Sequence, residues 1–390
     1  MVKNKTTQLI KTIKQKSKEL LTNHFKTREG RSTVIDGIRT IAIILMTFVH
    51  ARIYAYSYVN SNSIIDRISD FGGNVSYTLF LFCFGFGVYK LLDSKKENNK
   101  ALLRKTLYLF ASYLLISFIG YVSLIFEKAH IANISIVEIT SNPKFWEWIS
   151  NDIILIISGK GLVFLTEFLI SFPLFLLITL LLKKVLNLII RSDIYLYTFM
   201  FSIYLCGFLL SKSFETQTAG ALFWGYKDNH YFPILFYMPI YLLGIRWAHI
   251  NKHASDKFKL KWLSYTLMAF AIITIVSYKF LSFNRFPPSI SFISYSLTIT
   301  LAIPFTIFLI NSIYRFFRES GMKSLRTIKR VKTINFVKKA ISFIGQRSLK
   351  TFSIHTIFMF LYLILNLPVH TNYGLFIITW LITLISALLI

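Results

Sequence analysis

An aspartate, an arginine and a histidine share the first apolar segment of the chain and could do chemistry together. Asp36, Arg39 and His50 all fall within the run Ile35–Tyr56. In an α-helix, the eleven residues from Arg39 to His50 end about 20° past three full turns, so both side chains leave the same face, about 16 Å apart along the axis. Asp36 precedes Arg39 by three residues, which favours an intrahelical ion pair. Histidine titrates near neutral pH, so His50 is a candidate general base.

Two more ionisable side chains lie inside apolar segments. Glu167 is the only one between Gly161 and Leu182. A carboxylate in hydrocarbon needs a partner or a wet cavity, so we expect it to pair with His50 or Arg52, or to contact a polar substrate. His355 lies in a late apolar segment, where we expect a structural hydrogen bond.

A purely structural interpretation of the first segment is also open. Asp36 and Arg39 could cap the inner end of a helix, with the guanidinium extending to the membrane surface. His50 could simply bond a neighbouring helix. The residues alone leave both interpretations standing.

The composition places these residues in a membrane protein. Of 390 residues, 54% are hydrophobic and only 16% are charged, and the mean hydropathy is +0.56. The net charge of +27 would suggest a nucleic-acid partner in a soluble protein, but this hydropathy excludes that class. Cys83 and Cys206 lie far apart in apolar runs, so neither a disulfide framework nor a metal site is expected.

A helix that crosses a bilayer needs about 20 mostly apolar residues. Ten segments meet this need: Ile35–Tyr56, Val75–Leu92, Thr106–Phe126, Gly161–Leu182, Ile194–Leu210, Tyr231–Trp247, Trp262–Tyr278, Ile290–Tyr314, Ser348–Leu367 and Tyr373–Ile390. The sequence therefore predicts an all-α transmembrane bundle of about ten spans over residues 35–390. The basic segment 1–34 precedes it, either as an amphipathic helix on the inner leaflet or as a solvated tail.

The distribution of Lys and Arg predicts the orientation. With both termini in the cytoplasm, three quarters of the basic residues fall in the five inner segments, whereas acids and bases balance in the outer loops. This asymmetry is the positive-inside pattern of a multi-pass protein. The strongly basic inner face suits an anionic ligand from the cytoplasm.

Five segments together resemble the membrane acyltransferase-3 family. Asp36-Gly37-Ile38-Arg39, with His50 completing an Arg-x10-His motif, resembles its first span. Its later motifs are matched in order by Phe80–Phe86, Leu162–Leu169, Tyr241–Ile245 and Ile344–Leu349 with His355. The chain departs from the family pattern at Thr40, Phe84 and Val163.

This resemblance implies an integral-membrane O-acyltransferase of the bacterial inner membrane. Such an enzyme moves an acyl group, commonly acetyl from acetyl-CoA, to a hydroxyl of a cell-surface glycan or a lipid-linked sugar. His50 would be the catalytic base or an acyl relay. Arg39 would orient the acyl-CoA or stabilise the oxyanion, and Glu167 would polarise His50 or bind the acceptor.

Further residues would assist that reaction. Arg104 and Lys105, at the start of the third span, are candidates for contact with the CoA phosphates. Asp36 and His355 would support the site. Membrane lipids surround the bundle, and no metal is implied.

Other functions remain open at this point. An exporter of polysaccharide or lipid could use the same polar residues for translocation or proton coupling, although no inverted repeat is evident. A scaffold for envelope assembly is a third interpretation. The sequence leaves open the acceptor, the acyl group, direct or relayed transfer, and the oligomeric state.

Overall fold

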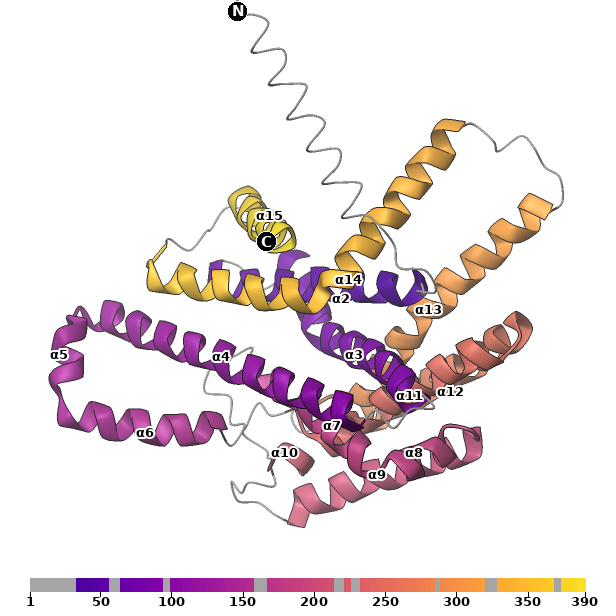
Figure 1. The fold of residues 1–390 in the computed structure, drawn as a ribbon, viewed down its shortest axis with the longest axis horizontal. Coiled ribbons are helices and arrows are strands. Elements are labelled where there is room, and N and C mark those ends of the chain that lie inside the picture. Colours follow the sequence, from indigo (N-terminus) through magenta and orange to yellow (C-terminus); the bar gives the residue numbers. More distant parts are fainter. Residues whose placement is uncertain are drawn as a thin grey trace, which may run out of the picture.

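The computed structural model describes residues 33–55, 64–93, 99–157, 167–213, 221–225, 232–284, 288–319, 328–367 and 373–390 (Figure 1). Its regular structure in these ranges is helical, which confirms the predicted all-α class. Nearly all of the basic segment 1–34, with its predicted amphipathic helix, lies outside them.

The helices follow the chain in this order: α2 (Thr33–Ala55), α3 (Ile64–Leu92), α4 (Asn99–Ala132), α5 (Ile136–Ser141), α6 (Pro143–Ile157), the 3-10 helix η1 (Glu167–Ile170), α7 (Ser171–Leu181), α8 (Lys183–Ile189), α9 (Asp193–Ser213), α10 (Ala221–Trp224), α11 (Ile234–His253), α12 (Asp256–Phe280), α13 (Ile290–Glu319), α14 (Ile328–Ile364) and α15 (Tyr373–Leu389).

Several helices are long and apolar enough to cross a bilayer, as a multi-pass membrane protein requires. In the described chain they lie in α2, α3, α4, α9, α12 and α13, six in all. A seventh candidate is the pair Phe168–Leu181 and Lys183–Ile189, which is bent by 88°. The other three predicted spans correspond to α11, α14 and α15, which fall short of the same criteria. The count of ten spans and the orientation of the termini therefore stay predictions.

The core is a stack in which α2 lies between α3 and α14, and α11 covers the other side of α3. α3 and α11 touch backbone to backbone, because a Cβ at Gly85 would collide with the carbonyl oxygen of Tyr241. A Cβ at Gly244 would likewise collide with that of Phe82. Small residues at such crossings let membrane helices pack closely.

A buried ion pair joins α2 to α3 at the end of the bundle where α2 finishes. Nη2 of Arg52 lies 2.6 Å from Oδ1 of Asp66, and both side chains are buried. This pair explains why α3 begins at Ile64, eleven residues before the predicted start of that span. The expected pairing of Arg52 with Glu167 stays a prediction, because the side chain of Glu167 lies outside what the structure describes.

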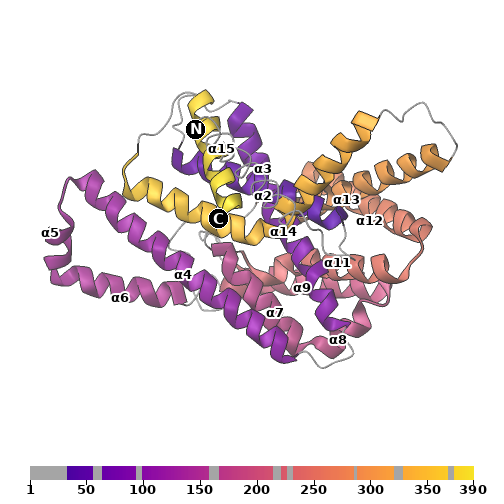
Figure 2. The ribbon, with the colours of Figure 1, turned by 45° about the horizontal axis from the view of Figure 1, so that its top comes forward.

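The remaining helices surround this core in both views. α4, α5 and α6 form a U, and α12 and α13 run as an antiparallel pair (Figures 1 and 2). Tyr121 of α4 donates a 2.9 Å hydrogen bond to Asp152 of α6 within the U.

Candidate active site

His50 lies in the C-terminal half of α2, where it is buried against α14. Its ring meets that of Phe352 edge-on, with centroids 5.2 Å apart, and its Nδ1 is 3.5 Å from Oγ1 of Thr356. The Thr356 hydroxyl donates to the Phe352 carbonyl at 2.9 Å, so toward His50 it acts as an acceptor. This arrangement favours a proton on Nδ1 and leaves Nε2 with the lone pair that a base needs.

A second imidazole, His355, faces His50 from α14. The two rings are 6.2 Å apart and inclined by 29°. Nε2 of His355 lies 3.1 Å from the carbonyl oxygen of Thr47, which only accepts, so Nε2 carries the proton. Nδ1 of His355 is buried and has no hydrogen-bond partner among the described residues. A buried acceptor in this state favours a ligand that donates to it.

Residues that sequence reasoning missed hold the two imidazoles in place. The Thr47 hydroxyl accepts a 3.1 Å hydrogen bond from Nε1 of Trp380 on α15. Phe48 packs edge-on against the same Trp380, with centroids 5.1 Å apart. Thr47 precedes His50 by three residues, which places both on one helix face, and that spacing was the available signal.

Arg39 lies near the start of α2, away from the imidazoles. Its Nη2 donates a 3.3 Å hydrogen bond to the carbonyl oxygen of Cys83 on α3. The adjacent Gly87 leaves the guanidinium room, since a Cβ there would lie 3.6 Å from Nη2. Arg39 therefore faces α3, and it is only partly buried.

Asp36, three residues earlier on α2, is bonded to α14 instead of α3. Its carboxylate is 1% exposed and accepts a 2.8 Å hydrogen bond from Ser342 of α14. The predicted ion pair between Asp36 and Arg39 is wrong among the described side chains, because α14 supplies a buried donor. The backbones also touch here, since a Cβ at Gly345 would collide with the Asp36 carbonyl oxygen.

The segment that carries Glu167 lies beside the imidazoles. Glu167 opens η1, and its side chain lies outside what the structure describes. The next residue, Phe168, packs against Phe352 with ring centroids 5.1 Å apart, and Phe352 in turn contacts His50. The backbone at Glu167 is therefore separated from His50 by two aromatic rings.

Arg104 and Lys105 are exposed near the start of α4. Among the described residues, no contact joins either of them to Arg39 or His50. The start of α4 is close to another basic residue, since Nζ of Lys183 lies 3.5 Å from Oδ1 of Asn99. Within the described ranges, no cluster of His, Cys, Asp and Glu could hold a metal ion.

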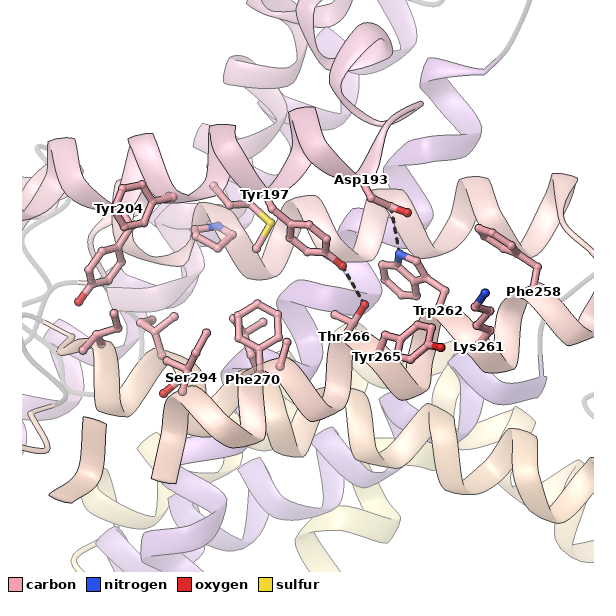
Figure 3. A pocket seen from close by; sticks show the side chains of 18 residues that line it. Asp193, Tyr197, Tyr204, Phe258, Lys261, Trp262, Tyr265, Thr266, Phe270 and Ser294 are labelled. Carbon is pink, nitrogen blue, oxygen red and sulfur yellow. Dashed lines mark hydrogen bonds between the residues drawn. The ribbon is translucent and has the colours of Figure 1, made fainter. Parts of the chain in front are cut away.

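A cavity of about 630 Å³ lies elsewhere, between α9, α12 and α13 (Figure 3). Several of its polar groups are already paired. The Tyr197 hydroxyl is 2.8 Å from that of Thr266, and Nε1 of Trp262 donates to Asp193 at 3.0 Å. None of the predicted site residues lines this cavity, and its surface is mostly aromatic and aliphatic.

A comparison with known protein families identifies the bundle that carries His50. The family model described as an acyltransferase domain, that of the acyltransferase 3 family, matches residues 33–390. No match was found among curated proteins or among solved structures. The matched range covers the whole membrane bundle, including both imidazoles and Arg39. The chain belongs to the acyltransferase 3 family and is a membrane-bound acyltransferase.

Proposed function

We propose that the protein transfers an acetyl group from cytoplasmic acetyl-CoA to a hydroxyl of a cell-surface or lipid-linked glycan at the bacterial plasma membrane. The observation that carries this proposal is the buried pair of His50 and His355. His50 presents the ring nitrogen that a base needs, and His355 has a buried acceptor with no donor among the described residues. One substrate hydroxyl could give its proton to Nε2 of His50, and a second hydroxyl of the same acceptor could donate to Nδ1 of His355.

In the direct form of the reaction, Nε2 of His50 takes the proton of the acceptor hydroxyl as its oxygen attacks the thioester carbonyl. The new C–O bond forms and the C–S bond breaks. The CoA sulfur leaves with the electron pair and takes the proton back from His50. Atoms and charge balance without any metal or redox partner.

A relayed form is the alternative. His50 would first accept the acetyl group on Nε2, while the departing CoA sulfur takes the proton from Nδ1. The acceptor oxygen would then take the acetyl group from the ring, and its proton would return to His50. Glu167 would polarise His50 or bind the acceptor in either form. The proximity of η1 to Phe352 supports a place for Glu167 near the reacting atoms.

Arg39 suits the orienting role better than the oxyanion role. Along α2 it is about 16 Å from His50, which is beyond the reach of a guanidinium to the reacting carbonyl. A guanidinium near the inner end of α2 could hold an anionic part of CoA while the flexible arm extends toward His50. Arg104 and Lys105 would contribute to phosphate binding on the same basic face.

The decisive experiment is turnover of labelled acetyl-CoA by the purified protein in lipid nanodiscs with a glycan acceptor. We expect release of CoA together with label in the glycan. An exporter would move glycan without consuming acetyl-CoA, so CoA release at the uncatalysed rate would contradict the proposal.

A further inference from the structure

A second, smaller cavity lies beyond the imidazoles, where α2, α4 and α14 end together. It holds about 210 Å³, and its polar lining comprises Tyr54, Glu127, His130, Tyr362 and Asn366. The C-terminal ends of α4 and α14 lie at the same end of the bundle in both ribbon views (Figures 1 and 2). The predicted topology places this end outside the cell.

The cavity continues the helix contact that buries the imidazoles. Tyr54 follows His50 by four residues on α2, about 6 Å further along the axis and on the same face. Tyr362 follows His355 by seven residues on α14, about 10 Å further along. Phe360 lies between, its ring centroid 6.2 Å from that of Tyr54. A molecule in this cavity would therefore lie directly above the candidate active site.

Local structure fixes the polar groups at the rim. The N–H of Leu367 donates to the carbonyl of Tyr362, and that of Asn366 to the carbonyl of Leu363, which is the hydrogen-bond pattern that closes a helix with a left-handed residue. Asn366 is that residue, with φ 49°. Glu127 and His130, three residues apart on α4, share one face.

The side chains that line the cavity indicate which chemical class of ligand it can bind. The side chains of Glu127, His130 and Asn366 have no hydrogen-bond or ion-pair partner among the described residues, so their donors and acceptors can serve a ligand. The cavity contains a carboxylate and no Lys or Arg, which disfavours phosphate or CoA. Tyrosine rings beside carboxylate, imidazole and amide groups suit a neutral molecule that carries several hydroxyls.

We infer that this cavity is a subsite that holds a sugar ring of the acceptor on the outer side of the candidate active site. The inference rests on the proposed function for the word acceptor, whereas saccharide binding can be tested without any turnover. Glu127 and Asn366 would fix the ring through its hydroxyls.

The first test measures binding alone. Purified protein in nanodiscs is titrated with methyl glycosides of glucose, galactose and N-acetylglucosamine, and saturation-transfer NMR follows each sugar. The isosteric Glu127→Gln should weaken binding about tenfold, because it replaces a charged acceptor by a neutral amide. Asn366→Gly keeps the left-handed backbone, removes the amide and should weaken binding as well.

Glu138→Gln is the matched control, since Glu138 is an exposed carboxylate on α5, outside the cavity. Binding that is equal in Glu127→Gln, Asn366→Gly and the control would overturn the inference. A second measurement compares KM for the acceptor with KM for acetyl-CoA, and only the former should rise in Glu127→Gln. If the wild type binds a glycoside through Glu127 but consumes no acetyl-CoA, the proposed function fails and the saccharide subsite stands.

Discussion

The His50 site and the cavity between α9, α12 and α13 use polar groups in opposite ways. The cavity is large, but the hydroxyls of Tyr197 and Thr266 face each other, and Trp262 is bonded to Asp193. At the His50 site both imidazoles are buried, and His355 keeps a buried nitrogen without a partner among the described residues. A large apolar pocket is the usual first candidate for an active site. In a bundle surrounded by lipid, the unsatisfied polar group is the better guide to chemistry.

The largest effect should follow from removing the base. His50→Ala should lower the rate of acetyl transfer by about 100-fold or more, because general base catalysis contributes about that much. The protein should still accumulate in the membrane. The check is CoA release by purified protein at matched concentration, and a rate near that of the wild type would place the chemistry elsewhere.

An added methyl group should destabilise the protein more between α2 and α14, at the His50 site, than on α9, beside the large cavity. Gly345→Ala forces α14 away from the Asp36 carbonyl and should destabilise the protein by about 1–3 kcal/mol. Gly207→Ala on α9 meets only side chains, the nearest being Leu235 at 3.1 Å and Phe236 at 3.4 Å, and should cost less. Thermal midpoints in detergent measure both variants. Equal midpoints would show that the contact between α2 and α14 is not specially tight.

A surface contact remote from both regions should matter least for stability. Lys252 of α11 donates to Asp93, just past α3, and this hydrogen bond holds the pKa of the Asp93 carboxyl below its usual value. A lowered pKa gives stability above the unfolded pKa of about 3.9, and this stability is lost as the pH falls through the folded pKa. Asp93→Asn should cost about 0.2–1 kcal/mol near pH 7, as exposed pairs do.

The measurement is the thermal midpoint of Asp93→Asn and wild type at pH 7 and near pH 3. The difference between the two proteins should shrink at the lower pH. A difference that grows on acidification would contradict the assigned sign.

Filling the large cavity should leave catalysis intact. Ala269 lines it, and Ala269→Phe should change the rate of acetyl transfer by less than about twofold, because the site is distant and shares no partners. The same CoA-release assay measures this variant beside His50→Ala. A loss comparable to that of His50→Ala would erase the distinction between the two regions.

The sequence predicted which segments are helical better than it predicted the residues at which each helix begins and ends. Each predicted span has a helical counterpart, but α3 begins at Ile64 and α4 continues to Ala132. A search for apolar segments stops at charged residues, whereas a helix continues where a partner such as Arg52 neutralises Asp66. The bend after Leu181 was not predicted either, because the pattern of apolar residues does not show it.

The sequence singled out candidate site residues, but it did not predict which side chains contact them in the structure. The same-face spacing singled out Arg39 and His50, yet nothing in one chain of letters shows that α2 packs against α14. His355, Thr356 and Ser342 join the site only through that packing. Asp36 was predicted to pair with Arg39 for the same reason. The residues around Asp36 do not show that the hydroxyl of Ser342, on a distant helix, packs against it.

Chemical rescue tests the central claim most directly, namely that the imidazole of His50 performs the proton or acyl transfer. His50→Gly removes the ring and leaves space for added imidazole in the buried site. We expect very slow acetyl transfer without imidazole and a rise of about tenfold or more when imidazole is added. Acetyl transfer at the wild-type rate in His50→Gly without imidazole would contradict the account.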